Sequence, residues 1–540
     1  MSSSPIHDPI QAGLASGWKV TDGARLEADL ALEADVAIVG TGAGGAVAAE
    51  ILAKAGLSVV LIEEGPLKSS RDFNMRESEA YPQLYHDSAG RKTRDKAITI
   101  LQGRCVGGST TVNWTTSFRT PPATLAYWDK QLGLKECSVA ALAPWFEAME
   151  QRLSISPWAV PPNENNDLLR RGAAKLGIET GIIRRNVKAC ADLGYCGMGC
   201  PIDAKQSMLV TTIPAALALG ARLLTRTRVD KLVFSGGRVS AIECRVMDER
   251  GVWPRAPRIR VAARHVVLAA GAIGSPGILL RSQAPDPHQL TGVRTFLHPT
   301  VISSALMPGR VGGHAGAPQS VYSDHFLGTH AIDGPMGYKL EVPPLHPLLF
   351  GVTLQGHGEP HAALMRQFQN AHVLLALLRD GFHEQSPGGK VRLRKDGSPE
   401  LDYPISDFVW DGVRRALLSM AEIQFAAGAA AVAPVHELGA QYRSWPEARA
   451  AIEKLPLQPL LARVSSAHVM GGCAMGADAK SSVVNAYGMH HQIENLSVFD
   501  GSIFPTSLGA NPQLSIYGLA ARNASRLVER LTGKAVPKPV

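Results

Sequence analysis

The sequence predicts an α/β fold, and three observations support this prediction. Short apolar runs typical of buried parallel strands occur near the beginning, in the middle and near the end of the 540-residue chain. The first run continues through a glycine-rich turn into a helical stretch and a second strand. A long stretch between the middle run and the last run is rich in proline, glycine and aromatic residues and lacks this pattern. We therefore expect a Rossmann-like nucleotide-binding domain assembled from discontinuous segments, with a separate α+β substrate-binding cap domain.

The first predicted unit is a strand, a helix and a second strand. "ADVAIVG" (Ala34 to Gly40) is a continuous apolar run that ends in glycine, "GAVAAEILAKAG" is helical, and "SVVLIEEG" is a second apolar strand. This order is typical of a βαβ unit with a right-handed crossover. We expect the later strands, "HVVLAAGAIGSPGILL" (His265 to Leu280) and "LSVFDGSIFP" (Leu496 to Pro505), to join the same sheet. A closing helix, "PQLSIYGLAARNASRLVERL", follows the last strand.

This order predicts a division of the chain into five segments. We expect a nucleotide-binding domain built from residues 1–120, 201–297 and 461–540, with the last segment carrying catalytic residues. Residues 121–200 form a cap and linking segment with a cysteine cluster, and residues 298–460 form the substrate-binding cap.

Composition excludes several other classes of protein. The formal charge is +8, but the basic residues are scattered, so we expect no nucleic-acid partner. The longest apolar stretch, "ALLSMAEIQFAAGAAAVAPV", is broken by Glu422 and Gln424 and favours a packed helix over a membrane span. No signal peptide is visible, which favours the cytoplasm, and export with a partner subunit and peripheral membrane association stay open.

A dinucleotide motif lies between the first strand and its helix. Gly40, Gly42 and Gly45 form G-x-G-x-x-G, in which glycine allows a tight turn and lets a pyrophosphate approach the backbone amides. Glu63 ends the second strand, where an acid can accept hydrogen bonds from ribose hydroxyls. These features predict a dinucleotide but do not distinguish FAD from NAD.

Four further motifs resemble the glucose-methanol-choline (GMC) oxidoreductase family. "GRCVGGSTTVNW" (Gly103 to Trp114) and "GAIGSPGILL" resemble its two signatures, and "HVMGGCAMG" and "FDGSIFPTSLGANPQLSIYGLAARN" resemble its C-terminal catalytic segments. The resemblance implies FAD. Some relatives bind FAD covalently through a histidine before the asparagine of "GGSxxxN", and Val112 at that position implies a non-covalent flavin.

The resemblance also implies a set of FAD-binding residues. Those expected at the pyrophosphate are Gly42, Ala43, Gly45, Asp500 and Gly501; those expected along the flavin are Gly108, Ser109 and Asn113; Glu63 is expected at the adenosine ribose and Val229 at the adenine.

His468 and Asn511 are the predicted catalytic residues, because they match the family's pair at the reactive edge of the flavin. An alcohol transfers a hydride to flavin N5 only as its hydroxyl proton leaves, so the site needs a base. Imidazole suits this role because its pKa lies near neutral pH. Asn511 can orient the hydroxyl and stabilise the developing alkoxide.

Three of the seven cysteines, Cys190, Cys196 and Cys200, are spaced C-x5-C-x3-C. The spacing resembles the iron-sulfur segment of bacterial FAD-dependent glucose dehydrogenases, so an iron-sulfur cluster is one hypothesis. "CGMGCPIDAKQS" also resembles long-chain alcohol oxidases, in which these cysteines need not hold a cluster. A loop with free thiols and a loop closed by a local disulfide are two further hypotheses, and a reducing compartment disfavours the disulfide.

The predicted function is an FAD-dependent oxidoreductase that acts on the CH-OH group of an apolar or long-chain alcohol. Its electron acceptor would be oxygen, a quinone or a cytochrome. A second hypothesis is a sugar or alcohol dehydrogenase whose iron-sulfur cluster passes electrons to a cytochrome partner. A hydroxynitrile lyase of the same fold is a hypothesis from another class, and a nucleotide-binding sensor is a non-enzymatic one.

Overall fold

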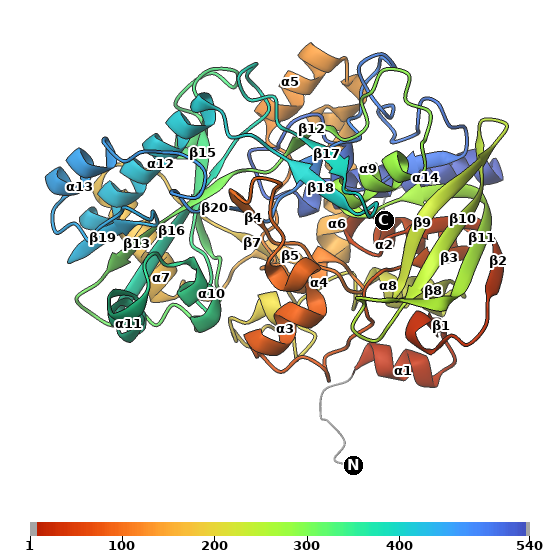
Figure 1. Ribbon diagram of the computed structural model, residues 1–540, viewed down its shortest axis with the longest axis horizontal. Helices are drawn as coiled ribbons and strands as arrows, with labels where there is room; N and C mark the ends of the chain where they lie inside the picture. Colours follow the sequence, from red (N-terminus) through yellow and green to blue (C-terminus); the bar gives the residue numbers. More distant parts are fainter. Residues whose placement is uncertain (1–7, 536–540) are drawn as a thin grey trace.

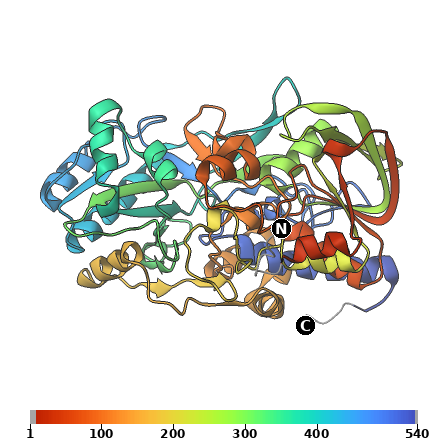
Figure 2. The same ribbon diagram turned by 90° about the horizontal axis from the view of Figure 1, so that it is seen from below.

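The computed structural model describes residues 8–535. Two sheet-containing halves lie side by side along the long axis (Figure 1). The view from below shows the same two halves side by side (Figure 2). We call the half that carries the glycine-rich turn the nucleotide half and the other the substrate half.

The nucleotide half is built on a mixed eight-stranded sheet in the order β1-β8-β3-β2-β11-β10-β9, with β22 also paired to β11. Its central strands run parallel, whereas β11, β10 and β9 form an antiparallel extension. The predicted strands from the beginning, middle and end of the chain therefore do share one sheet, which confirms the α/β prediction. The strands are β1 (Lys19–Asp22), β2 (Leu30–Val39), β3 (Val59–Ile62), β8 (Arg222–Thr225), β9 (Thr227–Ser235), β10 (Arg238–Met247), β11 (Pro254–Leu268) and β22 (Leu496–Val498).

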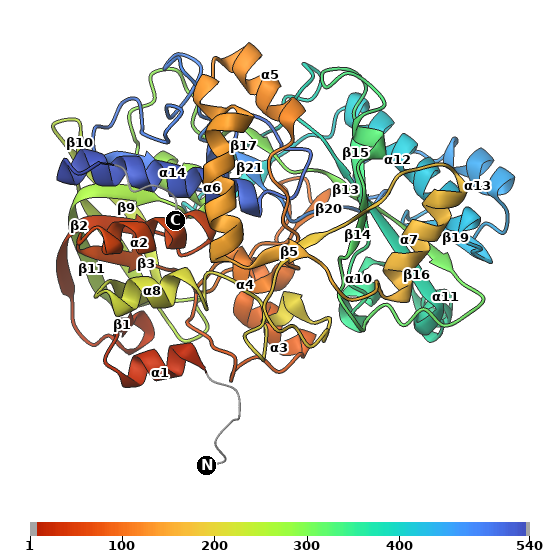
Figure 3. The same ribbon diagram turned by 180° about the vertical axis from the view of Figure 1, so that it is seen from behind.

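Helices cover one face of this sheet, as the view from behind shows (Figure 3). The helix of the predicted βαβ unit, α2 (Ala43–Lys54), packs between α8 (Thr212–Ala218) and the closing helix α14 (Gln513–Thr532). Its buried residues are small, mostly alanine and glycine, which allows the close approach. Within residues 8–535, no helix is both long enough and apolar enough to span a membrane.

The substrate half is built on a second eight-stranded sheet in the order β4-β20-β13-β16-β15-β14-β6, with β19 also paired to β13. Two of its short strands, β4 and β20, come from the first and last predicted nucleotide-binding segments. The long helix α12 (Asp407–Ala426) packs across this sheet. The strands are β4 (Ile98–Ile100), β6 (Gly181–Ile182), β13 (Thr300–Leu306), β14 (Val321–Ser323), β15 (Tyr338–Glu341), β16 (Ala371–Leu378), β19 (Ala431–Pro434) and β20 (Val464–Ser466).

The predicted helix over residues 416–435 is only partly correct. Helix α12 (Asp407–Ala426) covers the first part, but the segment after it turns and forms β19. Gly428 adopts φ +98°, a conformation that favours glycine, and it separates the helix from the strand.

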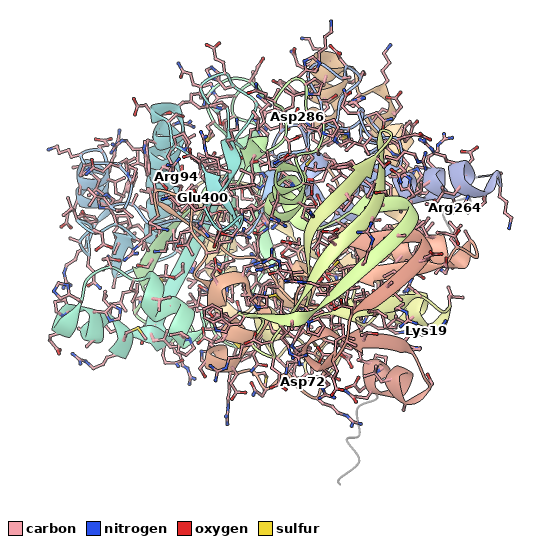
Figure 4. All side chains as sticks on the ribbon, turned by 45° about the vertical axis from the view of Figure 1, so that its right-hand side comes forward. Lys19, Asp72, Arg94, Arg264, Asp286 and Glu400 are labelled. Carbon is pink, nitrogen blue, oxygen red and sulfur yellow. The ribbon has the colours of Figure 1, made fainter. Side chains whose placement is uncertain are left out.

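Two smaller sheets and the remaining helices complete the fold. The β17–β18 hairpin lies beside the loop that precedes β4, where Arg94 forms ion pairs with Glu400 and Asp402 at 3.9 and 3.6 Å (Figure 4). The small sheets contain β12 (Val293–Phe296), β17 (Gly389–Leu393), β18 (Pro399–Asp402) and β21 (Met470–Gly471), and β5 (Ile155–Pro157) with β7 (Arg184–Asn186). The other helices are α1 (Pro9–Ala15), α3 (Glu77–Leu84), α4 (Ser109–Val112), α5 (Pro122–Leu132), α6 (Val139–Arg152), α7 (Glu164–Lys175), α9 (Gly271–Arg281), α10 (Pro347–Thr353), α11 (Gly358–Arg366) and α13 (Trp445–Ile452).

Candidate active site

The glycine-rich turn connects β2 directly to α2. Gly40 has φ +99°, and a Cβ there would lie 2.3 Å from the carbonyl oxygen of Ala269. Gly42 caps α2 without a side-chain hydrogen bond, and Ala43 is the first helical residue. The first N-H groups of this helix are therefore free to bind an anion such as a pyrophosphate.

Two glycines allow α2 to pack tightly. A Cβ on Gly45 would lie 2.1 Å from the carbonyl oxygen of Gly40, and one on Gly44 would lie 1.4 Å from that of Phe499. The second contact brings the C-terminal segment, which carries Asp500, against the start of the helix. The glycine pattern therefore reflects close backbone packing as well as an open turn.

Glu63 directly follows β3 and is buried. Its carboxylate accepts hydrogen bonds from the backbone N-H and the hydroxyl of Thr41, at 3.1 and 2.6 Å, and from the N-H of Gly65 at 2.9 Å. Burial raises the pKa of Glu63 above its ordinary value. A carboxylate offers about four acceptor positions, so it can also bind ribose hydroxyls.

Gly108, Ser109 and Asn113 lie at the two ends of the short helix α4. A Cβ on Gly108 would lie 2.9 Å from the Cα of Gly42, so this segment lies directly against the nucleotide turn. The Ser109 hydroxyl accepts from the N-H of Gly103 at 3.0 Å. Asn113 donates from Nδ2 to Oε1 of Gln513 at 2.6 Å, which links α4 to the closing helix.

Asp500 joins the C-terminal segment to the second glycine-rich turn. Its carboxylate accepts from the N-H of Gly271 at 2.9 Å and from Ser275 and Ser502, while Gly501 begins the short turn that follows. Burial raises the pKa of Asp500. Through these hydrogen bonds, Asp500 holds the backbone of both segments near the position predicted for the pyrophosphate.

Val229 lies in β9, where its carbonyl accepts from Arg281 at 2.9 Å. It is buried in the same sheet as the glycine-rich turn. An uncapped helix start, glycines in close contact and a buried acid after β3 fit the binding of FAD. We propose that the residues predicted from the sequence would hold it.

His468 and Asn511 lie together, although they are far apart in the sequence. His468 follows β20 and Asn511 precedes α14, and Nε2 of His468 is 3.5 Å from Nδ2 of Asn511. Burial lowers the pKa of His468 to about 4. The Oδ1 atom of Asn511 is buried and has no hydrogen-bond partner among the described residues.

A second histidine, His298, was not predicted. Its Nδ1 lies 3.4 Å from Nδ1 of His468, and its Nε2 accepts the N-H of Gly509 at 2.9 Å. Asp380 accepts the backbone N-H groups of Leu297 and His298 and holds this turn in place. The sequence offered only one local signal, the pair His298-Pro299 at the start of a strand.

Glu341 was also not predicted. It lies at the end of β15, fully buried, and its Oε2 accepts from Nδ2 of Asn511 at 3.2 Å and from Nε2 of Gln319 at 3.1 Å. Its Oε1 is buried and unpartnered within residues 8–535. The available signal was the pair Lys339 and Glu341 in an otherwise apolar strand, "YKLE".

Lys339 is buried on the same strand face as Glu341. Its Nζ pairs with Asp324 at 2.7 Å and lies 3.5 and 3.9 Å from the ring centroids of Phe118 and Tyr322. These contacts stabilise a positive charge beside the active site. The positive charge of Lys339 stabilises a negatively charged group nearby.

The three loop cysteines, Cys190, Cys196 and Cys200, are free thiols at partly exposed positions. Among the described residues, no three His, Cys, Asp or Glu side chains are grouped so as to hold a metal ion. Buried Lys205 anchors this loop to α4, donating to the carbonyls of Cys196 at 2.7 Å and Asn113 at 3.1 Å. This arrangement of thiols does not fit a metal cluster.

Sequence comparisons match most of the chain. The two profiles of GMC oxidoreductases match residues 37–300 and 385–520. A GMC-type oxidoreductase of Mycobacterium tuberculosis is 30% identical over 526 residues, which is 95% of this chain and 80% of that protein. A long-chain-alcohol oxidase of Arabidopsis thaliana is 27% identical over 542 residues, which is 96% of this chain and 70% of that protein.

Solved structures show the same fold at low identity. A formate oxidase of Aspergillus oryzae superposes with a TM-score of 0.67 at 14% identity, covering 94% of this chain and 100% of that one. Pyridoxine 4-oxidase of Mesorbium loti gives a TM-score of 0.64 at 19% identity, covering 91% and 98%. With the glycine-rich turn, Glu63 and the two GMC profiles, these matches confirm the resemblance: the chain belongs to the GMC oxidoreductase family and is an FAD-dependent enzyme.

Proposed function

We propose that this enzyme oxidises the CH-OH group of an apolar or long-chain alcohol to an aldehyde or ketone. The observation that supports the proposal most directly is the juxtaposition of His468 and Asn511, with two nitrogens 3.5 Å apart and, beside them, an Oδ1 atom that has no partner within residues 8–535. Such polar groups in a buried site can fix one small oxygen function. When bound, FAD accepts a hydride at N5 from the alcohol carbon.

The side chains of this chain have three tasks in that reaction. Asn511 and His468 would hold the hydroxyl oxygen and stabilise the charge that develops on it. A base must accept the hydroxyl proton; the sequence predicts His468, and the structure places Glu341 beside the same asparagine. The expectation of non-covalently bound FAD rests on Val112, a buried aliphatic residue at the end of α4.

The proposed substrate class rests on the relatives and on the amino-acid composition of the substrate half. Plant long-chain-alcohol oxidases are 27–28% identical to this chain over more than nine tenths of it. The segment from Gly337 to Gly356 is rich in leucine, proline and valine, and Leu345, Phe350 and Leu354 form a small apolar cluster there. The apolar composition of this segment favours an apolar alcohol over a sugar.

The absorbance spectrum of the anaerobic protein, recorded before and after addition of a medium-chain primary alcohol, tests the proposal. We expect the oxidised flavin bands to bleach in the wild-type protein. In Asn511→Leu, which removes both polar atoms, we expect the rate of bleaching to fall about 100-fold or more, because a donor to the developing oxyanion is lost. Flavin that stays oxidised with primary and secondary alcohols alike would overturn the proposal and favour a lyase.

A further inference from the structure

Arg379 is a buried arginine that directly follows β16 in the substrate sheet. Leu377, two residues earlier on β16, pairs with Lys339 of β15, and Glu341 lies two residues further along β15. Side chains two residues apart on a strand point to the same face of the sheet. The backbone N-H of Arg379 continues this pairing, since it donates to the carbonyl of Gly337 at 2.9 Å. Arg379 therefore lies on the sheet face that carries Lys339 and Glu341.

The side chain of Arg379 lies beside the turn that contacts His298. A Cβ on Gly509 would lie 3.0 Å from Cδ of Arg379, and the N-H of Gly509 donates to Nε2 of His298 at 2.9 Å. Burial lowers the pKa of His298, and the positive charge of Arg379 is among the charges that lower it further. Gly509 is two residues from Asn511, a span of about 7 Å at most. A small substrate molecule held at Asn511 is long enough to reach Arg379.

The guanidinium group of Arg379 has no carboxylate partner within residues 8–535. Its Nε is buried and makes no hydrogen bond in this part of the chain. Its Nη2 has one weak acceptor, the carbonyl of Ile332 at 3.5 Å, which is longer than an ordinary N-H···O bond. Burial lowers the pKa of Arg379 to about 10, so the group stays positively charged at neutral pH.

The other buried arginines of the described chain are better satisfied. Among residues 8–535 the buried arginines are Arg185, Arg379 and Arg522. Arg522 donates to two backbone carbonyls and to one side-chain amide, and Arg185 donates to the hydroxyl of Thr115 and the sulfur of Cys196. A buried charge is unfavourable unless a counter-charge and hydrogen bonds compensate it. Arg379 therefore lacks the compensation that an anionic ligand would supply.

We propose that Arg379 binds a carboxylate group of the substrate, so that the enzyme acts on hydroxy acids in which an apolar chain separates the CH-OH group from the carboxylate. This inference rests on the proposed function and narrows its apolar alcohol to one with a carboxylate at the far end. The two carboxylate oxygens would accept from Nε and Nη2, the edge of a guanidinium group that fits a carboxylate. One guanidinium group matches the single charge of a carboxylate better than the nearly double charge of a phosphate monoester.

The segment that covers Arg379 can admit such a group. Because Nε is buried, the chain around Ile332 must shift when the carboxylate binds. Ile332 belongs to the connection between β14 and β15, and most of residues 328–335 are exposed. A shift there breaks only the 3.5 Å contact with Arg379 and leaves the sheet pairing intact.

Arg379→Met tests the proposal, because methionine keeps an unbranched side chain but removes the charge and the donors. Anaerobic flavin reduction is measured with 6-hydroxyhexanoate and with 1-hexanol. We expect the KM for 6-hydroxyhexanoate to rise about 10-fold to 100-fold in the variant, the range for hydrogen bonds to a charged group. The rate and KM with 1-hexanol should stay at the wild-type values, which a purely structural role of Arg379 would not allow.

Binding of an unreactive carboxylate is a second readout that does not depend on turnover. Hexanoate should perturb the flavin absorbance of the wild-type protein and bind at least about 10-fold more tightly than hexanamide. This preference should disappear in Arg379→Met and be reduced in Arg379→Lys, which keeps the charge but not the paired donors. The thermal midpoint of ligand-free Arg379→Met should not fall, because an uncompensated buried charge is removed.

Arg294→Met is the matched control. Arg294 is a nearby arginine of β12, and its Nη2 donates to the carbonyls of Gly381 and Pro505 at 3.3 and 3.2 Å. Its removal takes away a positive charge close to Arg379 but leaves the proposed carboxylate site in place. It should keep the wild-type preference for hexanoate over hexanamide.

The outcomes separate this inference from the proposed function. If neither 1-hexanol nor 6-hydroxyhexanoate reduces the wild-type flavin, the proposed function fails, whereas hexanoate binding still tests the carboxylate site. If wild-type protein binds hexanoate no more tightly than hexanamide, or if Arg379→Met loses activity equally with both substrates, Arg379 has a structural role and our inference is wrong. If Arg379→Met does not fold, the hexanoate preference of the wild-type protein and its reduction in Arg379→Lys decide the question.

Discussion

The nucleotide end of the site is built mostly from main chain, whereas the substrate end is built from buried polar side chains. At the nucleotide end, glycines bring backbone atoms of α2, α4 and the C-terminal segment into direct contact. At the substrate end, Glu341, Asn511, His468 and His298 come from four separate segments and contact one another through hydrogen bonds. Stability at the first end therefore depends on close backbone packing, and stability at the second depends on the charges of its side chains.

The largest expected effect comes from adding one carbon atom at the nucleotide end. In Gly44→Ala the new Cβ would lie 1.4 Å from the carbonyl oxygen of Phe499, so α2 and the C-terminal segment must separate. We expect the free energy of unfolding to fall by about 3 kcal/mol and the bound flavin to be lost. Thermal unfolding and flavin absorbance measure both effects.

Gly309→Ala is the control for that change, because nothing lies within 4 Å of its Cβ position. It should unfold like the wild-type protein. If Gly44→Ala behaved like Gly309→Ala and kept its flavin, close backbone packing would not be what shapes the nucleotide end.

The substrate end should respond to pH instead. The folded-state pKa of Glu341, about 7, lies above its ordinary value of 4.5, so the folded protein binds this proton more tightly than the unfolded chain. Its stabilisation is present below pH 4.5 and is lost as the pH rises through 7. Relative to the wild-type protein, Glu341→Gln should therefore gain about 2 kcal/mol of stability between about pH 5 and about pH 8.

His468 provides a control of opposite sign. Its folded-state pKa of about 4 lies below the ordinary 6.5, so its burial lowers stability at low pH, and this loss is relieved as the pH rises toward 6.5. His468→Gln should gain stability over the wild-type protein mainly below about pH 6. Urea unfolding of the three proteins across this pH range measures the differences. Parallel curves for all three would show that neither side chain titrates in the folded protein as described.

The difference between a nucleotide end built from main chain and a substrate end built from distant side chains also explains which parts of the site the sequence could predict. The glycine-rich turn, Glu63 and the strand and helix around them lie within about thirty residues, and their spacing alone indicates a dinucleotide site. His468 and Asn511 could be identified because they lie in recognisable motifs. Their hydrogen-bond partners could not be.

Glu341 and His298 illustrate why. Glu341 lies 170 residues from Asn511 in the sequence, and the residues on either side of it are apolar. Only the pairing of β15 with β14 and β16 brings it into the site. The alanine-rich run after α12 is a similar case. Local propensity favours a longer helix, but pairing with β13 makes residues 431–434 a strand.

The smallest expected effect concerns the cysteine loop, which Lys205 anchors to α4. Cys190→Ser should change the free energy of unfolding by less than about 1 kcal/mol, because the side chain is partly exposed and makes no buried contact that serine cannot replace. Cys196→Ser should behave alike, since a serine hydroxyl can also accept the hydrogen bond that Arg185 donates to the sulfur at 3.5 Å. An iron assay and the visible spectrum of both variants provide the measurement. We expect wild-type protein without iron and unchanged flavin bands in both variants; iron in the wild-type protein that is lost in either variant would establish the cluster, and the loop would then be an electron-transfer site.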